Sequence, residues 1–516
     1  MKLFTTEEIS AIERATIEKE GITLHALVER AGQEAARAIA RRWTPSQRMI
    51  VFAGPGNNGA DALATAIFLV GMGYKPTVFL LNIGGNRISD ECRRWRDEIR
   101  TRFGNDSLIE VVGQHFSAPE IQPGDVVIDG MFGTGLREPL VGGFMALARY
   151  INESGAKIVS IDVPSGMFGD WNRQLITRNV IHADITLAIQ FPKIAFFFAE
   201  NAEIVGQWEV LDIGLSRQAI DQRPTNFVYI EEGEVRHLLH RRPRFCSKAD
   251  FGSACLVAGR YGMVGASVLA SRGALGTGVG KLTIHGPQCS FEICQSMVPE
   301  AMFHADANKI HVSQITLDHP FNALGIGPGL GTDDATIDAL DSFLRSRPSM
   351  PLVIDADGLN CIARRPSMLE QLPMLTVITP HAGEFDRLFG ESGTEESRLI
   401  KAIDAARRYN ILVLLKGAYS ALVRPDGKVY FNSTGTPALA TPGSGDVLTG
   451  MVTSFIAQGH KPEIAALLGS FVHGLAGRIA SRTHGEAGTA ASDIAACAGR
   501  AIDSIVNPHS EYKNLI

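Results

Sequence analysis

The chain has 516 residues, of which 45% are hydrophobic and 20% are charged. Its 49 Lys and Arg residues against 55 Asp and Glu residues give a formal charge of −6, which gives no support to a protein that binds nucleic acid by neutralising phosphates. At about 150 residues per domain, the length predicts two to four domains. The 53 glycines exceed the usual share of ~7% and are typical of an enzyme whose loops approach a ligand closely.

The seven cysteines are scattered, with no CxxC pair and no Cys/His spacing that suits zinc, which indicates a reducing compartment. The first ten residues, MKLFTTEEIS, lack the apolar segment of a signal peptide. The longest apolar stretch, 62–73, is far shorter than the ~20 residues that a membrane span needs. We therefore expect a cytoplasmic protein without a membrane or nucleic-acid partner, for which a homo-oligomer is compatible with the sequence.

The first half of the chain predicts an α/β fold. Thr5 and Glu8 have the spacing of a helix capping box, and apolar residues follow at helical intervals. A strand-like run at 49–53 leads through a glycine-rich loop into an Ala-rich helical stretch that ends near Gly73. Helical patterns separate several further strand-like runs, as in a Rossmann-like, doubly wound parallel sheet; these runs are 76–81, 125–132, 157–164 and 183–189.

A second α/β series follows the polar, proline-containing segment 216–225, where we place the domain boundary. The two domains are thus expected at 1–215 and 226–516. We interpret the basic stretch 236–248 as a solvent-exposed charge run at the entrance of the second domain. A patch that binds phosphate is the alternative. Pro-Asp-Gly within 420–431 predicts a hairpin, and the remaining strand-like runs are 254–260, 281–286, 321–331, 351–359, 375–384 and 411–417.

The glycine loop of the first domain satisfies GxGxxG with Gly54, Gly56 and Gly59, between a strand and a helix. This pattern predicts phosphate binding at a helix N-terminus. The hydride-transfer version of the motif also needs an acidic residue about 20 residues further on. Because the next strand ends in Leu-Asn-Ile-Gly (81–84), without a carboxylate, the sequence disfavours a dehydrogenase.

Other strand ends of the first domain carry oxygen-rich side chains. The glycine loop continues as Asn57-Asn58-Gly59-Ala60-Asp61, for which the alternative is an Asn-Gly turn with Asp61 as a helix cap. Asp129 ends one strand and Asp162 another, with Ser165 close behind. Carboxyl ends of parallel strands share one edge of a sheet. Asn58, Asp129 and Ser165 are therefore expected to converge on a hard monovalent cation.

The first domain resembles the epimerase domain of NAD(P)H-hydrate repair enzymes, the YjeF N-terminal family, from LFTTEEISAIERATIE (3–18) to WEVLDIGL (208–215). The resemblance implies K⁺ at Asn58, Asp129 and Ser165. It also implies that the hydrate binds to Asn57, Asn58, Gly59, Ala60, Asp61, Gly133, Thr134, Gly135, Leu136, Arg137, Glu138, Pro139 and Asp162, and Asp162 is suited to acid–base catalysis.

This sequence departs from the family pattern at Ala60 and Ala62, which replace two glycines. Each adds a Cβ beside a close backbone approach. We expect these methyl groups to narrow the pocket or to require a φ that alanine disfavours.

The strongest motif of the second domain lies within NSTGTPALATPGSGDVLTG (432–450). Gly443, Gly445 and the amides around Ser444 predict an anion-binding nest at a helix start. Asp446 is placed to take a proton from an attacking hydroxyl; a glycine-rich turn with Asp446 as N-cap is the alternative. The sequence has no GxxxxGK[ST] and so no P-loop. The loop after the strand-like run 411–417 is expected to contact nucleotide through Lys416, Gly417, Ala418, Tyr419 and Ser420.

These pieces resemble the ribokinase-like fold and, more closely, the NAD(P)H-hydrate dehydratase family across almost all of 226–516. The resemblance implies that Ala266, Gly329, His381 and Asp446 contact the hydrate. It also implies that residues 416–420 and Gly445 contact ADP or ATP, which acts with Mg²⁺.

Three further groups of polar residues in the second domain are considered as functional or structural. His381 and Glu384 do not form HExxH; we expect His381 to contact substrate and Glu384 to order Mg²⁺-bound water, against a purely structural role. Asp355 and Asp357 are either a metal pair or solvated or capping acids at a strand end. Lys248 is assigned no role.

The combined hypothesis is a bifunctional enzyme that epimerises NADH hydrate and NADPH hydrate and dehydrates the S form with ADP or ATP. One alternative is a ribokinase-like kinase for a vitamin precursor with a regulatory N-terminal domain. The other is a nucleotide-binding sensor.

Overall fold

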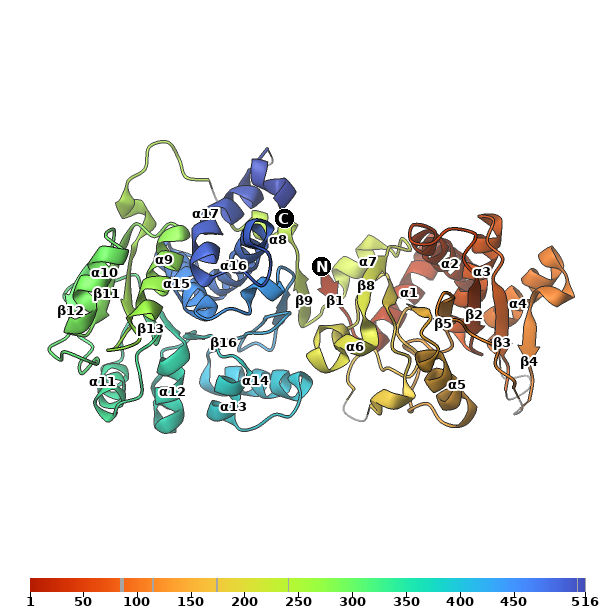
Figure 1. Cartoon of the computed structure of the whole chain (residues 1–516), viewed down its shortest axis with the longest axis horizontal. Helices are drawn as coiled ribbons and strands as arrows, with labels where there is room; N and C mark the ends of the chain where they lie inside the picture. Colours follow the sequence, from red (N-terminus) through yellow and green to blue (C-terminus); the bar gives the residue numbers. More distant parts are fainter. Residues whose placement is uncertain (84–87, 114–115, 173–174, 240, 508, 516) are drawn as a thin grey trace. The chain divides into compact units, whose positions relative to one another are not determined.

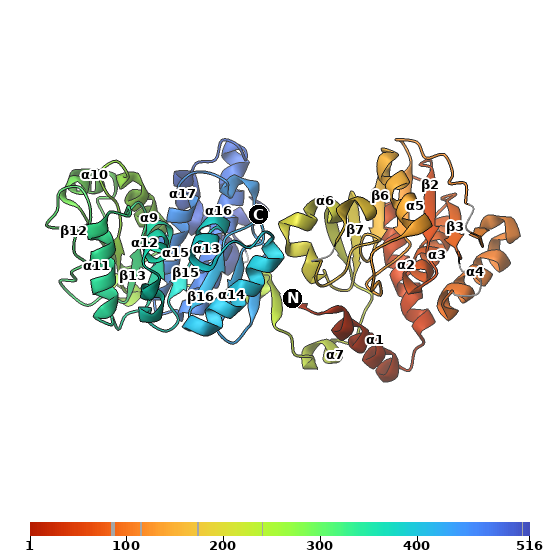
Figure 2. The same ribbon diagram turned by 90° about the horizontal axis from the view of Figure 1, so that it is seen from below.

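The computed structural model describes residues 1–83, 88–113, 116–172, 175–239, 241–507 and 509–515. Gly84 of the strand end 81–84 and His240 of the basic stretch lie outside these residues. The chain forms two compact units, residues 2–225 and residues 226–516 together with Met1 (Figures 1 and 2). The segment 216–225, where the sequence places the boundary, contains the helix α7 (Arg217–Gln222) and belongs to the first unit.

The first unit is an α/β unit. Its strands are β1 (Lys2–Leu3), β2 (Met49–Ala53), β3 (Thr77–Leu81), β4 (Ile109–Val111), β5 (Val126–Gly130), β6 (Lys157–Ile161), β7 (Ile185–Ile189) and β8 (Gln207–Leu211). Its helices, besides α7, are α1 (Thr6–Glu20), α2 (Leu24–Ala40), α3 (Asn57–Gly71), α4 (Asp90–Phe103), α5 (Gly142–Glu153) and α6 (Ala202–Val205).

Seven strands of this unit form a parallel sheet in the order β4-β3-β2-β5-β6-β7-β8. Side chains of β2 alternate between two cores: Met49, Val51 and Ala53 pack with α2, α3 and α4, whereas Ile50 and Phe52 pack with α5. Helices therefore cover both faces, which confirms the doubly wound prediction. The capping box is also confirmed, because Thr5 and Glu8 hydrogen-bond reciprocally at the start of α1.

The second unit is built around a larger sheet. Its strands are β9 (Phe227–Ile230), β10 (Ser253–Val257), β11 (Lys281–Gly286), β12 (Met302–Ala305), β13 (Ala323–Ile326), β14 (Leu352–Ile354), β15 (Val377–Ile378), β16 (Leu412–Leu415), β17 (Ala421–Val423) and β18 (Val429–Asn432). Its helices are α8 (Glu232–Arg236), α9 (Val264–Gly276), α10 (Phe291–Met297), α11 (Asp334–Arg345), α12 (Ala356–Arg364), α13 (Ala382–Phe389), α14 (Glu395–Tyr409), α15 (Ser444–Ala457), α16 (Pro462–His484) and α17 (Ala491–Val506).

These strands lie in the order β9-β18-β17-β16-β15-β14-β13-β10-β11-β12. The sheet is parallel except at β17, which pairs antiparallel to both β16 and β18, so the hairpin prediction is confirmed. Helices α9, α15, α16 and α17 share one core with the sheet, and α11 to α14 cover the other face (Figures 1 and 2). The predicted α/β class with parallel sheets is therefore confirmed for both units.

Helix α16 is long and apolar enough to cross a membrane by length and composition alone. In its most apolar window 83% of the residues are buried inside the protein, where they pack against α15 and α17. Burial of this kind is typical of the core helix of a globular domain.

Candidate active sites

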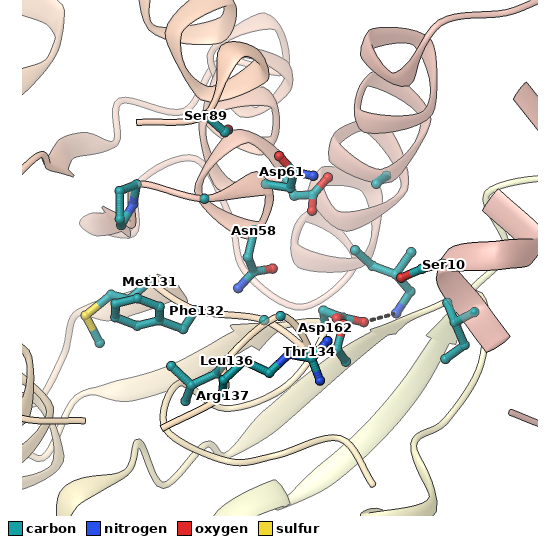
Figure 3. A pocket seen from close by; sticks show the side chains of 18 of the residues that line it. Ser10, Asn58, Asp61, Ser89, Met131, Phe132, Thr134, Leu136, Arg137 and Asp162 are labelled. Atoms are coloured by element: carbon teal, nitrogen blue, oxygen red, sulfur yellow. Dashed lines mark hydrogen bonds between the residues drawn. The ribbon is translucent and has the colours of Figure 1, made fainter. Parts of the chain in front are cut away.

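A cavity of about 1050 Å³ opens at the carboxyl edge of the first sheet (Figure 3). Its wall is built from α1, α2, the start of α3 and the loops after β5, β6 and β7. Open α/β sheets bind ligands at this edge. Most of the predicted hydrate-binding residues line the cavity, namely Asn57, Asn58, Asp61, Gly133, Thr134, Gly135, Leu136, Arg137, Glu138, Pro139 and Asp162.

Gly59 and Ala60 are predicted hydrate-binding residues that are not among the described residues of the cavity wall. A Cβ on Gly59 would lie 1.8 Å from the Gly54 carbonyl oxygen, so only glycine fits where the loop packs on the helix. Ala60 and Ala62 are fully buried in α3 and have no positive φ. A Cβ on Gly130 of β5 would lie 2.4 Å from the Ala62 Cβ, so this methyl group faces the sheet. The expectation that these alanines narrow the pocket or strain the backbone is therefore wrong.

The helix α3 begins at Asn57, with Gly56 as N-cap and no side-chain cap. Asp61 is the fifth residue of this helix, so the alternative in which Asp61 caps it is also wrong. The N–H groups of a first turn lack partners within the helix. They can therefore serve an anionic ligand at the cavity wall.

The three predicted potassium ligands lie close to this helix start. Asp129 is fully buried at the end of β5, where Oδ1 accepts from Ser165 Oγ at 2.6 Å and Oδ2 accepts from the Ser165 N–H at 2.9 Å. Burial raises the pKa of Asp129, against the lowering effect of these hydrogen bonds. Both polar atoms of the buried Asn58 amide lack a hydrogen-bond partner. An orphaned amide oxygen, a hydroxyl and a buried carboxylate are the donor set that a hard cation prefers, so these residues fit K⁺.

Asp162 is held in an unusual backbone conformation by its neighbours. It follows β6 with φ of +68°, which is uncommon for a residue other than glycine. Its N–H donates to the Leu187 carbonyl of β7 at 2.8 Å. The carboxylate forms an ion pair with Lys193, with 2.6 Å between Oδ1 and Nζ (Figure 3). The backbone thus aims Asp162 into the cavity beside a buried cation.

Two further carboxyl groups line the same cavity, Glu13 of α1 and Asp61 of α3. Burial and the charge of Asp162 raise the pKa of Glu13 to about 7. Burial, Asp162 and Glu13 together raise the pKa of Asp61 well above its usual range. Carboxyl groups with separated pKa values in one cavity are the arrangement that acid–base catalysis uses.

Sequence reasoning missed Lys193 and Glu13. Lys193 follows β7 at the same sheet edge as Asp129 and Asp162, so the strand-end argument applied to β7 points to it. Glu13 lies one helical turn after Ile9, within the opening segment 3–18, and nothing in its spacing separates it from other helical glutamates.

In the second domain the predicted anion nest forms the start of α15. Gly443 is the N-cap with φ of +86°, and Ser444 and Gly445 begin the helix. Ser444 Oγ lies 3.1 Å from Nε2 of the buried His473, and burial lowers the pKa of His473 to about 4. Asp446 is the third helical residue and not the N-cap. The nest geometry is therefore present, with a neutral histidine behind it.

A buried cluster of charged side chains stands next to this helix start. Lys416 Nζ lies 2.7 Å from Asp355 Oδ1 and 3.7 Å from Glu384 Oε2. The other oxygen of Asp355 accepts from Thr449 Oγ1 of α15 at 2.6 Å. Burial, and next the charge of Asp355, raise the pKa of Asp446 to about 7, while Lys416 opposes the rise. A carboxyl group with this pKa is suited to general-base work near neutral pH.

His381 and Glu384 form a capping box at the start of α13. His381 Nδ1 accepts from the N–H of Gly383 at 3.0 Å, and Glu384 Oε2 accepts from the His381 N–H at 2.9 Å. Accepting at Nδ1 leaves the proton of the neutral ring on Nε2. Nε2 lies 3.5 Å from Glu384 Oε1, and the His381 side chain is 52% exposed, so a ligand can also reach this edge of the ring.

Asp355 and Asp357 have separate partners. Asp355 is paired with Lys416, whereas Asp357 Oδ2 accepts from the Gly331 N–H at 2.9 Å and fastens the loop after β13. Among the described residues no group of three or more His, Cys, Asp or Glu side chains is arranged to hold a metal ion.

The remaining predicted residues lie on two loops. A Cβ on Gly329, where φ is +59°, would lie 2.9 Å from the Ala266 Cβ, so these two predicted hydrate contacts are neighbours. Residues 417–420 follow Lys416 at the end of β16, and the rings of Tyr419 and Tyr229 lie 6.4 Å apart. In the basic stretch, Arg242 stacks on Phe251 and Arg241 donates to Asn507, which favours the reading as a solvated charge run.

Fold and sites together define a two-domain α/β enzyme with a carboxylate-lined cavity in one domain and a phosphate nest beside a buried carboxyl group in the other. The family model for the YjeF-related protein N-terminus matches residues 24–195. The family model for NAD(P)H-hydrate dehydratase matches residues 254–499. The chain belongs to the family of bifunctional NAD(P)H-hydrate repair enzymes.

The relatives that support this assignment align with nearly the whole chain. The bifunctional NAD(P)H-hydrate repair enzyme of Moorella thermoacetica is 33% identical over 93% of this chain and 93% of its own length. That of Thermofilum pendens is 32% identical over 93% of this chain and 92% of its own. Among solved structures, the ADP/ATP-dependent NAD(P)H-hydrate dehydratase of Bacillus subtilis, co-crystallised with ATP and Mg²⁺, is 29% identical. It covers 55% of this chain and 100% of its own, with a TM-score of 0.49.

Proposed function

We propose that the first domain interconverts the R and S hydrates of NADH and NADPH, and that the second dehydrates the S hydrate with ADP or ATP as phosphoryl donor. The observation that carries this proposal is that this single chain aligns with bifunctional relatives along nearly its whole length, including both sites. The roles of individual residues below are part of the proposal.

Epimerisation needs a group that protonates the departing hydroxyl and a group that takes a proton from the water that adds to the same ring carbon. The hydrate carries a hydroxyl group next to the ring nitrogen, and the nitrogen lone pair expels it as water once it receives a proton. Water then adds to either face of the planar iminium and gives up a proton, so no atoms are gained or lost. Asp162, aimed into the cavity, exchanges this proton.

The helix start binds the hydrate through Asn57, Asn58 and Asp61, and the loop after β5 binds it through residues 133–139. Asn58, Asp129 and Ser165 would hold the potassium ion. The supporting observation is that the buried amide group of Asn58 has no hydrogen-bond partner. When bound, K⁺ supplies positive charge beside the anionic hydrate.

Dehydration begins with phosphoryl transfer. The hydroxyl oxygen of the S hydrate attacks the terminal phosphorus of the nucleotide, Asp446 takes the hydroxyl proton, and the shortened nucleotide leaves. Phosphate then departs with the electrons of the carbon–oxygen bond, and loss of a proton from the adjacent ring carbon restores the double bond. The amides at the start of α15 and the Lys416 ammonium group face the developing phosphoryl charge.

The other residues of this site position the two substrates. Ala266, Gly329 and the Nε2–H of His381 contact the hydrate, and residues 416–420 with Gly445 contact the nucleotide. When bound, Mg²⁺ would supply further positive charge at the phosphates, and Glu384 would order water beside it.

A reducing cytoplasm is the compartment that we propose for this enzyme. Its seven cysteines are all free thiols, five of them buried.

The test is incubation of NADH hydrate with the protein, Mg²⁺, K⁺ and either nucleotide, while the absorbance of NADH and the release of phosphate are followed. We expect equal amounts of NADH and phosphate. A stable phosphorylated product would identify a kinase instead, and binding without turnover would identify a sensor.

A further inference from the structure

Lys193 is a buried cation at the edge of the first cavity. Its side chain is 3% exposed, and that of its partner Asp162 is 12% exposed. Burying an ion is costly unless it is paired and hydrogen-bonded. The contacts of Lys193 therefore show what its charge acts on.

The ammonium group of Lys193 has three oxygen neighbours for its three protons. These are Asp162 Oδ1 at 2.6 Å, the Phe191 carbonyl at 2.9 Å and the Ile189 carbonyl at 3.2 Å. Ile189 ends β7, whereas Asp162 follows β6, so the side chain reaches from one strand end to the next. Lys193 thus holds Asp162 by direct contact, and its charge also opposes the raised pKa values of Glu13 and Asp170.

Several other titratable groups surround this pair. Glu13 belongs to α1, Asp61 to α3 and Asp170 to the loop after β6, and the charge of Arg14 of α1 acts on Glu13. Burial raises the pKa of Glu13 to about 7, and burial raises the pKa of Asp170 as well. Among these carboxyl groups, Asp162 is the one whose oxygen lies at 2.6 Å from the Lys193 ammonium.

We propose that Lys193 is a positioning residue for epimerisation: its ion pair fixes Asp162 as the carboxylate that receives the proton when water adds to the ring cation. This inference rests on the proposed function, in which Asp162 exchanges that proton. The proton that the departing hydroxyl needs comes from a neutral neighbour, Glu13. When water has added, the proton on Asp162 returns to the Glu13 carboxylate through cavity water, so the cycle closes without net proton change.

Two carboxyl groups thereby share the proton transfers that Asp162 alone would otherwise perform. The ion pair holds one oxygen of Asp162 in place, so that this carboxylate meets the water that adds in the R-to-S direction. In the S-to-R direction the same groups act in reverse: Asp162 donates the proton and the Glu13 carboxylate receives it.

The test compares Lys193→Met, Asp162→Asn and the double variant, with Lys157→Met as the matched control. Lys157 lies on β6 of the same domain, 62% exposed, and pairs with Asp184 at 2.7 Å. Conversion of pure R hydrate is measured in the full chain from pH 5 to 9, with the uncatalysed rate subtracted. Loss of an opposite charge beside a carboxylate moves its ionisation by about one to three pH units. We therefore expect the acid limb of the Lys193→Met profile to move to higher pH by that amount.

The double variant shows whether Lys193 acts through Asp162. In the Asp162→Asn background we expect Lys193→Met to change the rate less than about twofold, the signature of two residues that act as a unit. Lys157→Met should match the wild type throughout. An unmoved acid limb in Lys193→Met, or an equal further loss in the double variant, would overturn the proposal.

A conservative variant, Lys193→Arg, keeps a cation beside Asp162. We expect it to retain most of the conversion of R hydrate that Lys193→Met loses, and a loss equal to that of Lys193→Met would contradict the inference. If Asp162→Asn itself converts R hydrate at the wild-type rate, the proposed function of the first domain fails instead.

Discussion

Lys416 and the buried Asp355 form an ion pair of 2.7 Å that joins the ends of β16 and β14 beside the start of α15. Thr449 of α15 donates to the second oxygen of Asp355, so the pair is tied to the helix that carries Asp446. Burial is the main cause of the raised pKa of Asp446, and Asp355 and Lys416 act on it next, in opposite directions.

The substitution Asp446→Asn should remove dehydration and leave epimerisation intact. The amide cannot take the hydroxyl proton, and loss of a general base typically costs ~10²–10⁴-fold in rate. Conversion of S hydrate measures the first activity, and equilibration of R and S hydrates measures the second. Dehydration within a few-fold of the wild type in the folded variant would eliminate Asp446 as the base.

The pH dependence of dehydration should follow the ionisation of Asp446. Because its pKa is raised to about 7, the basic form grows as pH rises through 7, and the single-turnover rate should rise with it and then level off. Asp355→Asn removes the like charge that raises this pKa, so the acid limb should move to lower pH. Lys416→Met removes the opposing charge and should move the limb to higher pH. Shifts in the same direction would contradict this electrostatic account.

The substitution Asp162→Asn should stall repair of R hydrate while repair of S hydrate continues, since dehydration uses only the second domain. Omission of K⁺ should likewise slow only the R form, through Asn58, Asp129 and Ser165. Initial rates, corrected for uncatalysed epimerisation, are the measurement. Equal conversion of R hydrate by wild type and variant would leave the first domain as a ligand-binding module.

Much of this architecture follows from short-range signals in the sequence. The strand-like runs at 49–53 and 157–164 contain β2 and β6, and Thr5 and Glu8 form the predicted capping box. Asp129 and Ser165 lie in contact, as their places at strand ends predict, because parallel strands end on one side of a sheet.

The rest depends on contacts between distant residues. The edge strands β4 and β12 lack a strong apolar run, because one side of an edge strand has no partner strand. Lys193 and Glu13 belong to the site only because β7 and α1 bring them to Asp162. For Ala62 the resemblance to the family pattern indicates a missing glycine, but only the packing of α3 on Gly130 shows where its methyl group points.

Restoring glycine at positions 60 and 62 should destabilise the first domain without raising epimerase activity. Glycine inside a helix costs about 1 kcal/mol relative to alanine, and each substitution also removes a fully buried methyl group. All four tryptophans, Trp43, Trp95, Trp171 and Trp208, lie in the first domain, so their fluorescence during urea unfolding reports its stability. A faster epimerase of unchanged stability would show that the methyl groups crowd the cavity after all.

The stability of the first domain should carry a pH-dependent contribution from Glu13. Its pKa is raised from 4.5 to about 7 in the folded protein, so between these values the folded state binds more protons than the unfolded state. The free energy of unfolding therefore falls as pH rises through this window, because the folded state must either keep the proton or bury a charge.

Glu13→Gln cannot ionise and should lack this contribution. Relative to the wild type, the variant should gain stability between pH 5 and pH 8, as measured by tryptophan fluorescence in urea at both values. Glu18→Gln, at an exposed position on the same helix, is the control and should alter stability equally at both pH values. If the wild type and Glu13→Gln change in parallel with pH, then Glu13 ionises as freely in the folded protein as in the unfolded chain, and it is not the neutral carboxyl group that supplies the departing hydroxyl with its proton.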